Sequence, residues 1–214
     1  MTDAVKRSYS SELRAAQARE TRRIIVSAAA RLFVEQGFGR TTVDAIAEQA
    51  GVSRKTVFTA AGGKVELLKL ALDWAIVGDD EPVALEHRAA VQAAKQATDP
   101  DAILRGWVEV VTAVASRVAG LSAALAAAAA ADDGARQLWE QAQAQRLYGA
   151  RAFVDHLAAN GGLRSGLTPA HAADIAWLHS NPAMYRRLVI ERGWTAQQFH
   201  EWLFRTIKLQ LRPS

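Results

Sequence analysis

The stretch TTVDAIAEQAGVSRKTVF, residues 41–58, constrains the fold of this 214-residue chain more than any other segment. Apolar residues recur from Val43 to Ala50 at helical spacing, which predicts one short amphipathic helix. Gly51 follows at once, and a second helical pattern starts two residues later. A glycine that adopts a positive φ turns the chain within so few residues. The stretch therefore predicts two short helices joined by a tight turn.

Hydroxyl side chains mark the starts of both short helices. Thr42 stands at the N-cap position of the first, and Ser53 at the N-cap position of the second, which runs from 54 to about 61. Val57 and Phe58 are the apolar residues expected to anchor the second helix. This arrangement is typical of a helix-turn-helix, whose second helix enters the major groove of DNA. An ordinary helical hairpin is the alternative. The polar residues with no core to face are Arg54, Lys55, Thr56 and Thr59.

Two further helices are predicted around this pair. The first runs from about Arg19 to Gln36 and ends at Gly37. The other opens at Lys64, after two glycines, and runs to about Val77. A lysine at a helix N-terminus opposes the macrodipole, so we interpret Lys64 as a clamp for a phosphate group. The alternative is an exposed lysine whose small cost is tolerated.

The charge of the chain is concentrated in its first third. Residues 1–64 hold 11 Lys and Arg against 6 Asp and Glu, whereas residues 65–214 hold 15 against 16. This asymmetry indicates a basic module that faces a polyanion and is attached to a neutral body. A solvated basic tail is the alternative.

Alanine is common and strand-like runs of Val, Ile and Tyr are missing, so we expect an all-α fold.

Cap signals also divide the body into helices. Asp99-Pro100 predicts a helix to about Ala119, Gly134 one to about Ala159, and Thr168-Pro169 a further one. Asn181-Pro182 predicts an interruption and a short helix, and Thr195 with Gln198 predicts a capping box for the last helix.

The last helix is apolar over a wide arc and needs cover on more than one side. We interpret this as the interface of a homodimer, formed with the helix that Thr168 opens. Burial within one chain is the alternative. The predicted interface residues are Ile175, Phe199, Trp202, Leu203 and Ile207.

Aromatic residues gather in the middle of the body, and such faces either fill a core or line an apolar pocket. As residues that contact a small-molecule effector we predict Trp107, Val111, Tyr148, Trp177 and His179. His171 and Asp174 share one helix face, but no third ligand accompanies them, so we predict no metal site.

Several function classes find no support in the sequence. There is no cysteine, nucleophile elbow, Gly-rich phosphate loop or metal-ligand set, so we expect neither an enzyme nor a cofactor. The N-terminus has no apolar signal segment, and the alanine-rich run 121–131 is shorter than the roughly 20 residues of a membrane span. We therefore expect a cytoplasmic protein without a membrane partner.

The chain resembles the TetR family of bacterial repressors. The resemblance rests on RETRRIIVSAAARLFVEQGFGRTTVDAIAEQAGVSRKTVFTAAGGKVELL, residues 19–68, and more loosely on MYRRLVIERGWTAQQFHEWL, residues 184–203. It implies a homodimer that binds a palindromic DNA operator and releases it when a small apolar or amphipathic molecule binds. The expected division is a flexible basic arm (1–18), a helix-turn-helix domain (19–64), and a helical ligand-binding and dimerisation domain (65–214).

The resemblance also implies roles for single residues. The DNA-binding residues are expected to be Arg40, Thr42, Ser53, Arg54, Lys55, Thr56, Phe58, Thr59 and Lys64. Phe58 stands where the family usually has a tyrosine, and Ala60 and Ala61 stand where it usually has aromatic or histidine residues. A helical adaptor or ligand carrier that has lost DNA binding is therefore the alternative function. The basic arm, with Lys6, Arg7, Arg14 and Arg19, is expected to compensate by reaching the minor groove or flanking phosphates.

Overall fold

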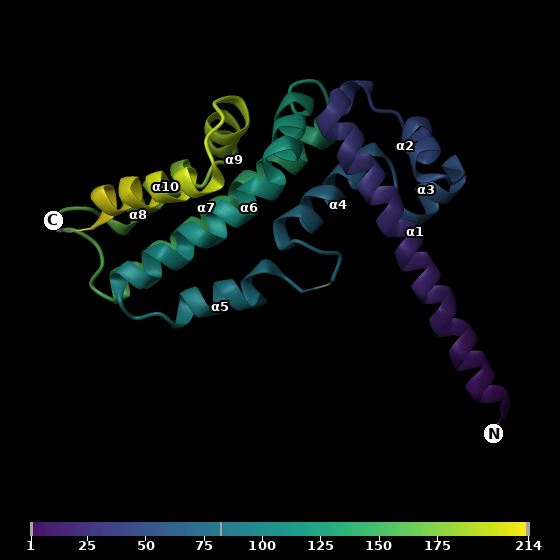
Figure 1. Cartoon of the computed structure of the whole chain (residues 1–214), viewed down its shortest axis with the longest axis horizontal. Helices are drawn as coiled ribbons and strands as arrows, with labels where there is room; N and C mark the ends of the chain where they lie inside the picture. Colours follow the sequence, from purple (N-terminus) through teal and green to yellow (C-terminus); the bar gives the residue numbers. More distant parts are fainter. Residues whose placement is uncertain (1, 82, 213–214) are drawn as a thin grey trace.

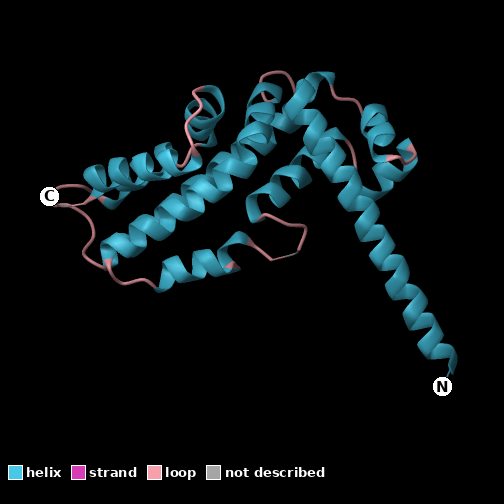
Figure 2. Ribbon diagram, viewed as in Figure 1, coloured by secondary structure: helices cyan, strands magenta, loops and turns pink. Residues whose placement is uncertain are grey.

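The computed structural model describes residues 2–81 and 83–212, with side chains for residues 13–81 and 83–212. Over these residues the chain is helical and contains no strand, as predicted (Figure 2). The helices are α1 (Thr2–Arg40), α2 (Val43–Ala50), α3 (Arg54–Ala61), α4 (Lys64–Val77), the 3₁₀ turn η1 (Leu85–His87), α5 (Ala89–Gln96), α6 (Pro100–Ala128), α7 (Asp133–Ala159), α8 (Pro169–His179), α9 (Pro182–Tyr185), the π-helical turn η2 (Arg186–Glu191) and α10 (Ala196–Leu211).

The helices form two groups that share α6. Helices α2 and α3 lie beside α1 at one end of the molecule, and α8 and α10 lie at the other end (Figure 1). Helix α6 runs between the two groups and contacts α1, α4, α5, α7, α9 and α10. The position of the helix-turn-helix relative to the body is therefore set by how α1 and α4 pack on α6.

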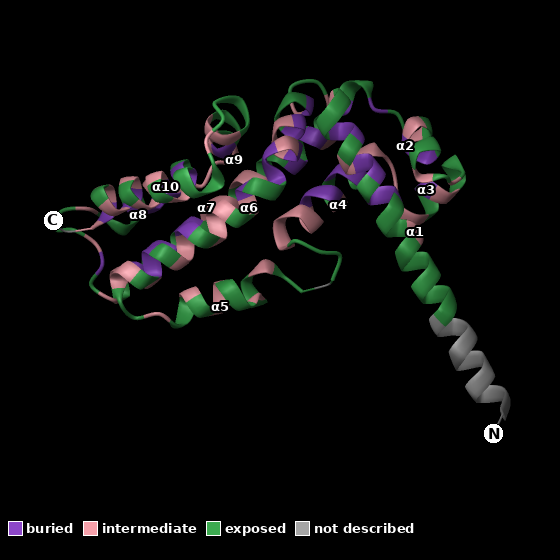
Figure 3. Cartoon of the chain, in the orientation of Figure 1, coloured by how far each residue is buried: buried purple, intermediate pink, exposed green. Residues whose placement is uncertain are grey.

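Helix α1 begins at Thr2 and not near Arg19 as predicted. Residues 2–36 contain no glycine or proline and are rich in Ala, Arg and Glu, so no residue stops the helix earlier. At Gly37 the backbone leaves the helix (φ 78°), as expected. The exposed side chains of residues 13–20 form no core (Figure 3). The side chains of Lys6 and Arg7, which belong to the predicted arm, lie outside the described residues.

The buried side chains of the described residues form two hydrophobic cores, and Figure 3 marks buried residues in purple. We call first core the cluster that α1–α4 form with the end of α6 and the start of α7, through residues such as Leu121, Leu125 and Ala135. We call second core the cluster that the earlier part of α6 forms with α7–α10, through residues such as Leu104 and Leu203. The first core thus includes residues from beyond the helix-turn-helix.

Helix α6 is longer than predicted, because it continues through Gly120 to Ala128. A Cβ atom at Gly120 would lie 3.0 Å from the Val34 side chain, so the glycine allows α6 to approach α1 closely. By length and composition alone, α6 is apolar enough to cross a membrane. The prediction considered only residues 121–131, which are too few to do so. Core helices of globular proteins pass the same test, and α6 packs against six other helices.

The predicted caps of the body helices are confirmed. The Asp99 carboxylate accepts the Ala102 N–H at 2.8 Å, and Thr168 caps α8. Thr195 and Gln198 bond reciprocally, at 3.1 Å and 2.8 Å, in the capping box of α10. The turn η1 and helix α5 were not predicted, because neither has a side-chain cap hydrogen bond that marks its start.

The predicted dimer interface requires a correction. Phe199, Leu203 and Ile207 are fully buried within the protomer, because this face of α10 packs into the second core against α6. For these three residues the prediction was wrong, and burial within one chain is what the structure shows. Ile175 and Trp202 are half-buried. The large apolar side chains that α8 and α10 expose are Leu178 (54%) and Leu209 (82%).

Candidate DNA-binding surface

The turn between α2 and α3 has the geometry predicted from the sequence. Gly51 adopts a left-handed conformation (φ 66°, ψ 31°) and donates its N–H to the Glu48 carbonyl at 3.1 Å. The Val52 N–H donates to the Ala47 carbonyl at 3.0 Å, which closes the turn. Ala47 and Val57 are buried in the first core, so the two short helices are locked together. This confirms the helix-turn-helix.

Both predicted N-caps are present, and both face solvent. The Thr42 hydroxyl accepts the Ala45 N–H at 3.1 Å, and the Ser53 hydroxyl accepts the Thr56 N–H at 3.1 Å. The remaining first-turn amides of a helix have no intrahelical acceptor and bear partial positive charge. The exposed starts of α2 and α3 are thus suited to meet phosphate oxygens.

The outer face of α3 is polar with one aromatic residue. Lys55 and Thr59 are exposed, and the Thr59 hydroxyl donates to the Lys55 carbonyl at 2.9 Å. Thr56 is half-buried, and its hydroxyl lies 2.8 Å from that of Ser53. Phe58 is 45% exposed, so its predicted anchoring in the core was wrong, whereas the buried Val57 anchors the helix as predicted.

Arg54 is held by a residue that the sequence analysis missed. Its guanidinium pairs with the Asp44 carboxylate at 2.6 Å and lies 5.5 Å from the Phe58 ring centroid. An exposed ion pair contributes only about 0–1 kcal/mol, so Arg54 can exchange Asp44 for a phosphate at little cost. The signal available in the sequence was an acidic residue in the first turn of the preceding helix.

Lys64 is neither a free clamp for a phosphate nor an exposed lysine without a role. Its ammonium donates to the Phe38 carbonyl at 2.9 Å and lies 4.0 Å from the Phe38 ring centroid. The half-buried side chain thereby ties the start of α4 to the end of α1. An ammonium has three protons, so a phosphate contact stays a prediction beside this structural role. Arg40 is exposed, and its Nε donates to the Gln36 carbonyl at 2.9 Å.

Two small residues support this surface from within. Thr41 is buried, and its hydroxyl lies 2.8 Å from the Gly37 carbonyl and 3.1 Å from the Leu32 carbonyl. The sequence analysis missed it because Thr41 neither caps a helix nor joins an apolar stripe. Ala61 is buried in the first core, whereas Ala60 is half-buried against it. The small side chain at position 61 therefore has a packing role.

None of the five predicted effector residues lines the pocket between α1, α4 and α6 or the pocket between α1 and α2. Trp107 stacks on Phe153 with 4.6 Å between ring centroids, and Val111 packs against the second core. His179 is buried, with its Nδ1 2.9 Å from the Ile175 carbonyl. Tyr148 is 70% exposed and belongs to no buried wall.

Trp177, the fifth of these residues, lies beside a half-buried arginine. The Arg146 guanidinium is 4.7 Å from the Trp177 ring centroid and donates to the Trp177 carbonyl and, at 3.4 Å, to the Ser180 hydroxyl. It thus caps the C-terminus of α8, where the helix dipole favours a cation. Burial lowers the pKa of the Arg146 guanidinium to about 10. Among the described side chains, no three His, Asp or Glu residues lie close enough together to hold a metal ion.

Residues 25–71 match the family model described as bacterial regulatory proteins of the tetR family. This segment spans the buried part of α1, the whole helix-turn-helix and the start of α4. We call the matched segment the tetR-family domain, because it is similar to this family's model. The model covers the two capped helices, the turn at Gly51 and Lys64, the features that define the candidate surface.

Two curated relatives are similar to this chain over a short segment. The chain is 47% identical over 58 residues to two Pseudomonas putida proteins, the uncharacterized regulator TtgW and the regulator SrpR, both described as HTH-type transcriptional regulators. The matched segment is 27% of this chain, 43% of TtgW and 27% of SrpR, so the chain spans less than half the length of either relative.

Structural similarity extends over both groups of helices. A Saccharomonospora viridis regulator in complex with choline superimposes with a TM-score of 0.70 at 17% identity, covering 92% of this chain and 100% of the other. NalD, the secondary repressor of the MexAB-OprM multidrug efflux pump in Pseudomonas aeruginosa, gives a TM-score of 0.67 at 18% identity, covering 92% and 99%. At such identities the likeness shows the shared fold: an N-terminal helix-turn-helix domain with a helical C-terminal domain.

Proposed function

We propose that the chain is a cytoplasmic transcriptional repressor that binds a palindromic operator as a homodimer and releases it when a small apolar or amphipathic molecule binds. The observation that carries this proposal is the exposed face of α3. This face presents Lys55 and Thr59 to solvent while Val57 fixes the helix from behind. Similarity to the tetR family, whose members are regulatory proteins, supports it.

The proposed mechanism depends on α4, which is fastened at both ends. At its start, Lys64 bonds to the Phe38 carbonyl of α1. In its last turn, the carbonyls of Ala75 and Ile76 accept hydrogen bonds from Arg117 of α6 at 2.7 Å and 2.8 Å. A molecule that binds in the body and shifts α6 would therefore move α4. That movement changes the distance between the recognition helices of the dimer, and two half-sites are bound together only at one spacing.

The first test is selection of bound sequences from random duplex DNA by the purified protein. We expect enrichment of a palindrome, and affinity that falls steeply with salt. Lys55→Ala should weaken binding to the enriched site about tenfold, because it removes a phosphate or base contact. Arg151→Ala is the matched control, since it removes one exposed charge from α7. Equal losses in both variants would contradict the role of α3.

The second candidate function is a helical adaptor or ligand carrier that does not read DNA. The observation that favours it is the pair Ala60 and Ala61, which offers no hydroxyl, imidazole or aromatic ring to the DNA backbone. No enriched sequence, even at low salt, would support this function over the repressor.

The homodimer is proposed to form through the exposed faces of α8 and α10, two helices that contact one another. Leu178 and Leu209 are exposed there, beside the half-buried Ile175 and Trp202. Leu209→Glu should convert a dimer into a monomer in sedimentation experiments. Ile190→Glu, at an exposed position of η2, is the matched control and should leave the mass unchanged. A wild-type monomer at micromolar concentration would refute the interface.

A further inference from the structure

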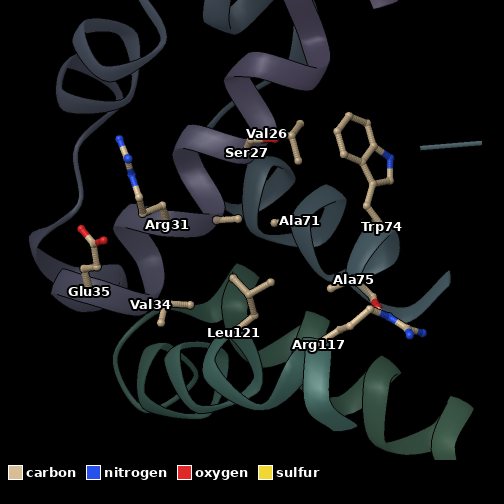
Figure 4. Close-up of a pocket in the computed structure, with 11 residues that line it drawn as sticks. Val26, Ser27, Arg31, Val34, Glu35, Ala71, Trp74, Ala75, Arg117 and Leu121 are labelled. Atoms are coloured by element: carbon tan, nitrogen blue, oxygen red, sulfur yellow. The ribbon is translucent and has the colours of Figure 1, made fainter. Parts of the chain in front are cut away.

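A cavity of about 440 Å³ lies at the joint between the tetR-family domain and the body, between α1, α4 and α6 (Figure 4). None of the five predicted effector residues lines it. Its volume falls in the range of small-molecule sites, roughly 300–1,000 Å³. We call it the joint cavity. Its walls include Val26, Ala30, Val34, Ala71, Trp74 and Leu121.

The walls of the joint cavity are apolar because small side chains face each other across the joint. Ala30 of α1 and Ala71 and Ala75 of α4 leave space that longer side chains would fill. Trp74 is half-buried and offers an aromatic surface to this space. Figure 4 shows the side chains of Trp74 and Leu121 on different sides of it. Such walls fit a flat apolar or aromatic molecule.

The rim of the joint cavity carries more positive than negative charge. Arg31, Glu35 and Arg117 line it, which gives two cations and one carboxylate. Arg117 is held in place by its hydrogen bonds to the Ala75 and Ile76 carbonyls, and burial lowers the pKa of its guanidinium. An apolar molecule with a single negative group matches this combination of walls and rim.

We propose that the joint cavity binds a small aromatic anion, and that the bound molecule changes the affinity for DNA by acting on α1 and α4 directly. All three helices that would contact the molecule also fix the helix-turn-helix. Helix α1 packs against α2 and α3 in the first core, and α4 is hydrogen-bonded to α1 and to α6. A molecule bound between α1 and α6 would therefore change how the helix-turn-helix packs on the body without any change in the second core. The binding half of this proposal does not depend on the proposed function, whereas the effect on DNA does.

The test of binding uses the full chain without DNA, and 8-anilinonaphthalene-1-sulfonate as the aromatic anion. Its fluorescence should report one saturable site per protomer. Ser27 is exposed and lines the joint cavity, so Ser27→Trp should fill the entrance and weaken binding about tenfold or more. Ser116→Trp, at an exposed position of α6 outside the lining, is the matched control and should bind as the wild type does. Unchanged binding by the Ser27 variant would overturn the proposal.

A second comparison tests the charge of the ligand and does not depend on the tryptophan variant folding. Arg31→Gln removes one rim cation at an exposed position. It should weaken the sulfonate several-fold and leave the uncharged probe N-phenyl-1-naphthylamine unaffected. Equal effects on both probes would refute the anion class. Circular dichroism of each variant checks that the fold is intact.

The effect on DNA is measured separately, with the operator obtained from random-sequence selection. Saturating sulfonate should shift the operator affinity of the wild type, and Ser27→Trp should abolish that shift. Probe binding without any such shift would overturn the regulatory half of the proposal. If the chain selects no operator, the proposed function fails while the result of the probe titration stands.

Discussion

The first and second cores are built by different kinds of packing. The first core consists of aliphatic and alanine side chains with two phenylalanines, Phe33 and Phe38, stacked at 5.7 Å. The second core is held by aromatic pairs, such as Trp107 on Phe153 and Tyr185 edge-on to Phe199. Among the described residues, the tetR-family domain thus contains one aromatic pair where the body contains several. It depends instead on α6 and α7 for part of its cover.

The largest expected effect comes from truncating a buried leucine in either core. Leu125 of α6 is buried in the first core, and Leu203 of α10 is buried in the second. Either change to alanine should cost about 2–5 kcal/mol in the free energy of unfolding, measured in urea. Under conditions where both variants are folded, only Leu125→Ala should also weaken DNA binding. Equal DNA affinities would show that the first core does not couple the domain to α6.

The second prediction concerns the turn between α2 and α3. Gly51 has φ 66°, so Gly51→Ala places a Cβ in the left-handed region, at a cost of about 1–2 kcal/mol. Gly51→Asn should cost less, because asparagine tolerates this conformation better. Nothing lies within 4 Å of the added Cβ, so the loss is conformational and not steric. Urea unfolding of both variants measures the difference, and a larger loss for asparagine would contradict this account.

The two regions also differ in how far the sequence predicts them. The bounds of α2 and the start of α3 follow from Thr42, Gly51 and Ser53, because caps and turns are set by residues within one or two turns. The helices and caps of the candidate surface were therefore predictable from local sequence, whereas the Arg54–Asp44 pair and the buried Thr41 were not. The face that α10 turns inward was not predicted, because an apolar arc of a helix looks the same whether α6 or another protomer covers it.

The hydrogen bonds that join α4 to α1 and to α6 were not predictable either. Lys64 meets Phe38, and Arg117 meets Ala75, across 26 and 42 residues of sequence. Neither pair has a local pattern, since each depends on where α4 lies once α1 and α6 have packed. The joint cavity is hidden from the sequence for the same reason: its alanines look like ordinary helix-forming residues.

A third prediction concerns the cap of the recognition helix. Ser53→Ala removes the acceptor for the Thr56 N–H and should cost about 1 kcal/mol. Thr195→Ala makes the same change at the start of α10 and serves as the matched case in the body. Both should lower Tm by similar amounts, and only Ser53→Ala should reduce operator affinity. A reduction in operator affinity for Thr195→Ala of the same size would show that DNA binding follows global stability.

The smallest expected effect belongs to an ionic tie in the body. The Asp101 carboxylate, at the start of α6, accepts a hydrogen bond from Lys208 and lies 3.1 Å from an Arg212 nitrogen. The Lys208 hydrogen bond, with the charges of Arg212 and Lys208, holds the pKa of Asp101 below its ordinary value. Because the folded state favours the ionised form, the tie stabilises the protein above the ordinary pKa of aspartate. Its contribution declines as pH falls through that value towards the lowered folded pKa.

Asp101→Asn tests this tie, because it keeps the size of the side chain and removes the charge. Its Tm should lie below that of the wild type at pH 7, and the gap should narrow as pH falls from about 5 to 3. Asp79→Asn is the companion variant. The exposed Asp79 is paired with Arg88 near the end of α4, and the Arg88 hydrogen bond likewise lowers its pKa. Since the Asp101 tie joins α6 to α10 and the Asp79 pair is local, a wider gap for Asp79→Asn would mean that the body does not depend on its long-range contacts.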